Sequence, residues 1–299
     1  MRKTGSFSVS LIEAVGTALV AAVMIAPVAA KALTIYGFTF PFARIFDRAV
    51  MATMLITLLL FARRLALMDF LRRGFRNPRI GFGQAVRGLV LAAGAIGVLF
   101  VLTAFAGGEI SGAVIASSMM RYLPAAVLIG AIEESFFRAF LLAGMEQEFG
   151  SFGALIVSSA IYALVHVARS PARVYLTQFE PTAGVKTLVA YAERMFHPEV
   201  GPLLFGLFLL GLVLGAALIL TRRVYCSLGL HVGFVLGAKT WRLAVSGTIP
   251  RWIAGPGAVP LVAAPAGWVI SAIMLIFLPL FLRNQQHLEA DPPYGAREL

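Results

Sequence analysis

Eight long apolar runs constrain the fold of this chain more than any other feature. They lie near residues 10–30, 50–69, 86–106, 119–143, 151–168, 201–221, 225–245 and 259–282. A helix needs about 20 mostly apolar residues to cross the hydrocarbon core of a bilayer. Open irregular backbone is too costly in lipid, and the runs lack the alternation of barrel strands. The sequence therefore predicts an all-α polytopic membrane protein, a bundle of about eight transmembrane helices.

The composition excludes most other classes of protein. Of the 299 residues, 60 % are hydrophobic and 13 % are charged, whereas soluble domains average about 25 % charged residues. A disordered chain and a disulfide scaffold are excluded, because hydrophobic residues dominate and Cys226 is the only cysteine. The net charge of +11 indicates cytoplasmic loops and contact with anionic lipid of the bilayer, with no nucleic acid as a partner. No repeat or linker divides the chain, so we expect a single integral membrane domain over residues 1–299.

Basic residues predict the orientation in the membrane. The segment between the second and third runs holds the densest group, Arg63, Arg64, Arg72, Arg73, Arg76, Arg79 and Arg87. Such loops stay in the cytoplasm, so we expect both termini in the cytoplasm and the protein in the cell (inner) membrane. The first run resembles a secretion signal, but its length favours an uncleaved helix. Between Pro181 and Pro198, apolar residues recur at helical spacing, which predicts a short amphipathic surface helix serving as a connector or, alternatively, as a lid.

Ionisable residues inside the fourth run indicate a functional site, because a charged side chain within the bilayer costs free energy that a purely structural helix would avoid. This run contains Glu133, Glu134 and Arg138. Glu134 and Arg138 are four residues apart, so they share a helix face in the favourable order for an ion pair. Glu133 lies about 100° further round the helix. A structural salt-bridge latch is the alternative interpretation, but it leaves the second acid unexplained.

Two histidines in later runs provide partners for these acids. Tyr162 and His166 share a face of the fifth run, and a glycine-containing turn at 149–153 joins it to the fourth run. An antiparallel hairpin about this turn places Glu133 and His166 at the same depth. His231 lies in the seventh run, on one face with Ser227 and Val235. We therefore expect a site built from Glu133, Glu134, Arg138, His166 and His231.

This set of residues suits hydrolysis. A poorly solvated Glu133, assisted by His166, can draw a proton from water, while Glu134 stays ionised beside Arg138 and orients the site. His231 can donate to the oxyanion that forms when water attacks an amide carbonyl. Glu133, His166 and His231 would equally serve as three zinc ligands with an open fourth position. No H-E-x-x-H motif is present, so the spacing gives zinc no separate support.

The order of these motifs resembles a known family. Glu133-Glu134-x-x-x-Arg138, then Tyr162-x-x-x-His166, then His231 is similar to the CPBP family of intramembrane proteases, the CAAX prenyl endopeptidase and bacteriocin-processing or abortive-infection type. The resemblance covers residues 120–245 and implies that Glu133 activates water with help from His166. It implies an oxyanion-side or metal-side role for His231, and a membrane-associated protein or peptide as substrate. Family members are described both as metal-dependent and as metal-free glutamate enzymes, so zinc stays open.

The chain departs from the family pattern at two positions. Tyr162 replaces the usual phenylalanine, which is a mild change. Val235 stands where the family commonly has asparagine, and valine cannot donate a hydrogen bond. Loss of one oxyanion donor typically costs about a hundred- to a thousand-fold in turnover. Ser227, one turn before His231, is a candidate substitute donor.

Three functions therefore follow from the sequence. The first is an intramembrane endopeptidase. The second is an ion-coupled transporter, but transporters usually have two related halves, and no matching ionisable set occurs in the first three runs. The third is a non-catalytic immunity or interaction protein of the membrane. This alternative remains because Val235 replaces the asparagine that is common in the family.

Overall fold

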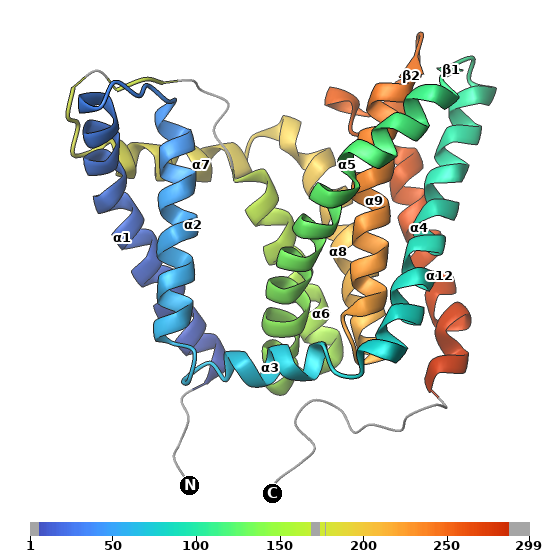
Figure 1. Cartoon of the computed structure of the whole chain (residues 1–299), viewed down its shortest axis with the longest axis horizontal. Helices are drawn as coiled ribbons and strands as arrows, with labels where there is room; N and C mark the ends of the chain where they lie inside the picture. The colour runs from blue at the N-terminus through green and yellow to red at the C-terminus, as the bar shows by residue number, and fades with distance from the viewer. Residues whose placement is uncertain (1–5, 169–173, 177, 287–299) are drawn as a thin grey trace, which may run out of the picture. The chain divides into compact units, whose positions relative to one another are not determined.

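The computed structural model describes residues 6–168, 174–176 and 178–286. Its described part is built almost wholly of helices (Figure 1), which confirms the all-α membrane fold. The residues divide into two compact units, drawn from Met1–Met68 with Leu164–Gly201 and from Asp69–Ala163 with Pro202–Leu299.

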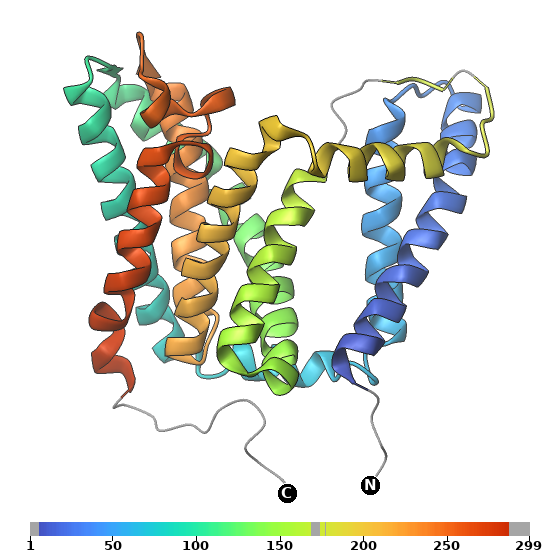
Figure 2. The same ribbon diagram turned by 180° about the vertical axis from the view of Figure 1, so that it is seen from behind.

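The first unit contains α1 (Phe7–Ile35), α2 (Phe42–Leu60) and α7 (Ala183–Met195). Figure 2 shows α1 and α2 side by side, with α7 lying across them near one end. A β-carbon on Gly184 would lie 2.3 Å from the Val23 carbonyl oxygen, so glycine lets α7 approach the backbone of α1 closely. The Tyr191 hydroxyl donates to Asp47 Oδ1 of α2 at 2.6 Å. Helix α7 confirms the predicted amphipathic helix, while its role as connector or lid stays a prediction.

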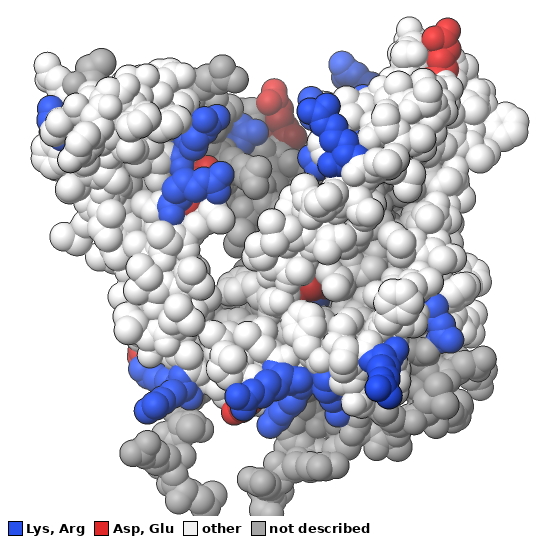
Figure 3. Space-filling model, viewed as in Figure 1, with Lys and Arg blue, Asp and Glu red and all other residues white. Residues whose placement is uncertain are grey.

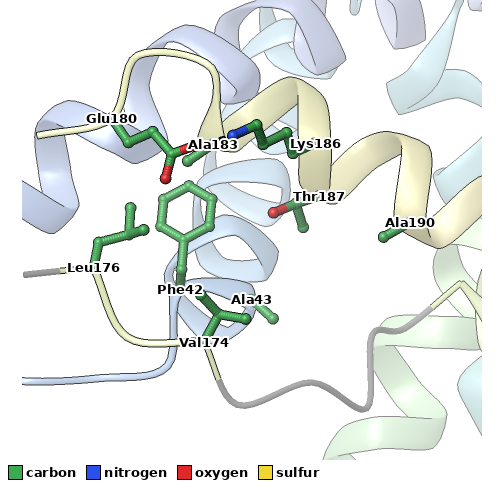
Figure 4. Close-up of a pocket in the computed structure, with 9 residues that line it drawn as sticks. All are labelled: Phe42, Ala43, Val174, Leu176, Glu180, Ala183, Lys186, Thr187 and Ala190. Atoms are coloured by element: carbon green, nitrogen blue, oxygen red, sulfur yellow. Dashed lines mark hydrogen bonds and ion pairs between the residues drawn. The ribbon is translucent and has the colours of Figure 1, made fainter.

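A hollow of about 200 Å³ lies between α7 and the start of α2 (Figure 4). The Phe42 ring and Leu176 form its apolar wall. Lys186 binds Glu180 at the rim, and this hydrogen bond holds the pKa of the Glu180 carboxyl below its ordinary value.

The second unit holds most of the remaining helices. They are α4 (Pro78–Phe105), α5 (Gly112–Glu134), the π-helix η1 (Ser135–Leu142), α6 (Ala143–Val167), α8 (Gly201–Thr221), α9 (Tyr225–Ala244) and α12 (Pro265–Gln286). Its shorter elements are α3 (Leu67–Gly74), α10 (Arg251–Ala254), η3 (Pro256–Ala258) and α11 (Pro260–Ala263), whereas η2 (Pro198–Val200) lies in the first unit. Strands β1 (Glu109–Ile110) and β2 (Val245–Ser246) pair antiparallel, which joins the turn after α4 to the end of α9.

Glycines hold α9 against α4 at backbone distance. A β-carbon on Gly229 would lie 2.0 Å from the Ala85 carbonyl oxygen, and one on Gly88 would lie 2.1 Å from the Cys226 carbonyl oxygen. Gly233 continues the same face of α9 against Ala92. Small residues at helical spacing allow this close approach between membrane helices. The interface fixes which face of α9 turns away from α4, toward α5.

The helices match the predicted runs with shifted boundaries. Helix α2 covers Phe42–Leu60 instead of 50–69, and α12 begins at Pro265 instead of 259. Gly150, at φ 65°, reverses the chain within α6 and confirms the predicted glycine turn. Among the described residues, five segments are long and apolar enough to cross a membrane, namely Phe7–Ile35, Pro78–Phe105, Gly112–Val167, Pro198–Thr221 and Pro265–Leu282. The Gly112–Val167 segment includes the Gly150 reversal and so covers two predicted runs. The count of eight transmembrane helices stays a prediction.

Candidate functional site

The two glutamates lie at the point where α5 passes into the π-helix η1. Glu134 ends α5 and is fully buried, and Arg138 lies in η1 with 1 % of its surface exposed. The Glu133 side chain is 25 % exposed. Segments of π-helix inside α-helices are often found at functional sites. The predicted pair of neighbouring carboxylates therefore has one sealed member and one accessible member.

The buried Glu134 carboxylate is bound by two side chains of α9. Its Oε1 lies 2.8 Å from His231 Nδ1, and its Oε2 accepts a hydrogen bond from the Ser227 hydroxyl. Arg138 Nε lies 3.7 Å from the same Oε2 and forms the ion pair expected from the spacing. An ionised carboxylate only accepts hydrogen bonds. His231 therefore carries its Nδ1 proton toward Glu134.

Because Nδ1 of His231 binds Glu134, the other ring nitrogen, Nε2, faces Glu133. His231 Nε2 lies 3.7 Å from Glu133 Oε2. A histidine held at one nitrogen by a carboxylate presents the other nitrogen for chemistry in a fixed orientation. Glu134 thus orients the His231 ring, and Glu133 lies beside Nε2, the nitrogen that this orientation presents for chemistry.

Arg138 is held by more than its ion pair. Its guanidinium lies 4.7 Å from the ring centroid of Tyr162 on α6, and its Nη2 donates to the Gly211 carbonyl of α8 at 3.5 Å. The Phe137 ring meets the Tyr162 ring edge-on. Stacking on an aromatic face suits the weakly hydrated guanidinium better than it would suit lysine. One buried cation therefore links η1, α6 and α8.

The turn between α8 and α9 fixes where α9 begins. Arg222 adopts a left-handed backbone conformation at φ 54°, and its Nη1 lies 2.9 Å and 3.1 Å from the two oxygens of Glu146. The Val224 amide donates to the Gly74 carbonyl of α3 at 3.1 Å. These bonds position the first turn of α9, which carries Ser227.

The structure brings four of the five predicted site residues together, namely Glu133, Glu134, Arg138 and His231. The fifth, His166, lies in the last turn of α6, four residues after Tyr162. This end of α6 belongs to the first compact unit. The pairing of His166 with Glu133 stays a prediction.

Sequence reasoning missed two contacts of the site. The Gly211 carbonyl carries no signal in the sequence, since any residue offers a backbone oxygen. Ser227 is different, because its place one turn before His231 marks it as a neighbour. The sequence interpretation made Ser227 a substitute oxyanion donor, whereas its hydroxyl binds Glu134.

Val235 lies one turn beyond His231 in apolar surroundings. It packs against the buried cluster of Ala126, Val232 and Leu236. The position commonly occupied by asparagine in the family is thus part of the apolar contact between α5 and α9.

The donor groups of the site offer limited coordination for a metal ion. Among residues 6–168, 174–176 and 178–286, no group of three or more His, Cys, Asp or Glu side chains is arranged to hold a metal ion. Glu133 and His231 Nε2 form a pair of oxygen and nitrogen donors. Nδ1 of His231 is already used by Glu134. Zinc at Glu133, His166 and His231 stays a prediction.

Comparison with known proteins gives one match. Residues 115–237 match the family model described as type II CAAX prenyl endopeptidase Rce1-like. No curated protein and no solved structure matches the chain. The matched range contains Glu133, Glu134, Arg138, His166 and His231. Together with the apolar helices, the match indicates an integral membrane protein of a protease family. Residues 115–237, less than half of the chain, are therefore similar to the Rce1-like type II CAAX prenyl endopeptidases, in agreement with the resemblance of the motifs to the CPBP family.

Proposed function

We propose that the protein is an intramembrane endopeptidase that hydrolyses a peptide bond in a membrane-associated protein or peptide. The family match supports protease activity in general. The observation that carries the finer proposal is the orientation of His231, whose Nδ1 is held by buried Glu134 while Nε2 faces Glu133. This arrangement gives the two neighbouring carboxylates separate roles.

In the proposed reaction, Glu133 takes a proton from water as the water oxygen attacks the scissile carbonyl carbon. His166 assists by binding the same water. His231, whose Nδ1 is bound by Glu134, donates a hydrogen bond from Nε2 to the oxyanion that forms. The C–N bond then breaks, and Glu133 passes its proton to the departing amine nitrogen.

Site variants test this proposal directly. Glu133→Gln, His166→Ala and His231→Ala should each abolish cleavage of a prenylated peptide reporter in liposomes, because each removes a group that contacts water or the oxyanion. The amount of folded protein, measured by gel filtration in detergent, should stay at the wild-type level. Glu109→Gln is the matched control, since Glu109 lies in β1 and binds Ser246. Cleavage by Glu133→Gln at the wild-type rate would refute the mechanism.

The apolar packing of Val235 supports a second candidate, a non-catalytic membrane interaction or immunity protein. In that case, a cellular phenotype of the wild-type gene would survive the Glu133→Gln substitution. The endopeptidase proposal requires that the phenotype disappear with this substitution.

A further inference from the structure

The Ser227 side chain contacts the carboxylate of Glu134. It is in the first turn of α9, fully buried, and shares a face with His231 one turn later. Its hydroxyl donates to Glu134 Oε2, and His231 Nδ1 binds Oε1. Two adjacent turns of α9 thus hold both oxygens of one carboxylate.

Arg138 alone does not fix this carboxylate. Its Nε lies 3.7 Å from Oε2, which is beyond hydrogen-bond distance. The Ser227 hydroxyl is therefore the side-chain hydrogen-bond donor that the structure places on Oε2. A glutamate carboxylate rotates broadly about its last torsion, so the position of Oε1 under His231 depends on what holds Oε2.

The orientation of Glu134 in turn decides the state of the His231 ring. While Oε1 faces Nδ1, the proton stays on Nδ1 and Nε2 is presented to Glu133. Without a donor on Oε2, the carboxylate can turn toward the guanidinium of Arg138 and leave Nδ1. The ring is then free to rotate, and no carboxylate holds the proton on Nδ1.

We propose that Ser227 is a positioning residue that fixes the Glu134 carboxylate and, through it, the ring orientation and Nδ1 protonation of His231. This inference rests on the proposed endopeptidase function. It also gives Ser227 a role other than that of a substitute oxyanion donor, since its hydroxyl is already committed to Glu134.

The kinetic test compares two substitutions at this position. Ser227→Ala should lower kcat on a peptide reporter about 10- to 100-fold, the range typical of losing an outer group that orients a metal-bound histidine. KM should stay unchanged, because Ser227 is buried and does not meet the substrate. Ser227→Thr retains the hydroxyl and should restore most of the activity. Ser158→Ala is the matched control, because Ser158 is equally buried and bonds to the Leu155 carbonyl of its own helix.

A spectroscopic test needs no substrate. The chain has four histidines, so ¹⁵N-histidine labelling gives a short list of ring resonances, and His231→Gln assigns those of His231. The wild type should show a protonated Nδ1 at His231, and Ser227→Ala should move this resonance toward the unprotonated range. An unchanged Nδ1 resonance in Ser227→Ala would overturn the proposal, as would an unchanged kcat.

These outcomes are distinct from failure of the proposed function. If Glu133→Gln is inactive while Ser227→Ala keeps the wild-type kcat, the endopeptidase proposal stands and the Ser227 proposal fails. If Glu133→Gln cleaves normally, the mechanism fails, and the ¹⁵N resonances still decide whether Ser227 orients His231.

Discussion

At the scale of single residues, the site depends on a buried charge that is held from several sides. Glu134 and Arg138 are both sealed from solvent, and burying an ion pair costs desolvation energy that good geometry only partly returns. Their pairing is therefore better explained by the position it gives to His231 than by a gain in stability.

Removing one partner of this pair should be costly. We expect Arg138→Gln to lower the free energy of unfolding by about 3–5 kcal/mol, because it leaves the Glu134 carboxylate buried without its cation. The double variant Glu134→Gln/Arg138→Gln should recover much of that loss while staying inactive. Thermal unfolding of the wild type, Glu134→Gln, Arg138→Gln and the double variant in detergent measures this cycle. Equal destabilisation by the single and double variants would contradict the coupling.

The sequence predicts these residues better than it predicts their contacts. Spacing alone places Glu134 and Arg138 on one helix face, and the ion pair is present. The contact between Glu134 and His231 could not be predicted, because it depends on the rotation of α9 about its own axis. That rotation is fixed by packing against α4 through Gly229 and Gly233, and their four-residue spacing marks a close-packing face of α9 without identifying the helix that it meets.

At the scale of helices, close packing between α4 and α9 sets the direction in which the site residues face. Gly229 on one side and Gly88 on the other meet backbone carbonyls, which cannot move aside as a flexible side chain would. The face of α9 that carries Ser227 and His231 is held toward α5 by this contact.

A pair of glycine substitutions tests this role. Gly229→Ala should destabilise the protein by about 1–3 kcal/mol through overpacking against Ala85, and should also reduce activity by displacing α9. Gly94→Ala is the control, because no atom lies within 4 Å of a β-carbon built there. It should be neutral or stabilise α4 by about 0.5–1 kcal/mol. Melting temperatures in detergent and reporter cleavage check both expectations, and a harmless Gly229→Ala would show that the contact is dispensable.

At the scale of the whole molecule, charge and apolar length together determine how the chain lies in the bilayer. Long apolar helices identify an integral membrane protein. Figure 3 shows basic side chains gathered over α3 and the start of α4. We propose that this end faces the cytoplasm, in accord with the positive-inside rule, and that the protein resides in the cell membrane.

Cysteine labelling tests the orientation. Cys226, the only cysteine, is buried, so a Cys226→Ala background allows single cysteines to be introduced at exposed Arg79 and Phe105, near opposite ends of α4. In intact cells, a membrane-impermeant maleimide should label Phe105→Cys, and it should label Arg79→Cys only after lysis. The reverse pattern would invert the proposed topology.

The π-helix η1 has a consequence for how this protein can vary. Removal of one residue from a regular α-helix rotates everything after it by about 100°, but a π-helical stretch already holds an extra residue within the helix. Loss of one residue from η1 would return it to α-helical turns, and the helix leading to Gly150 would keep its register. We therefore expect relatives that keep the site to accept a one-residue deletion between Ser135 and Leu142 more readily than within α5 or α6.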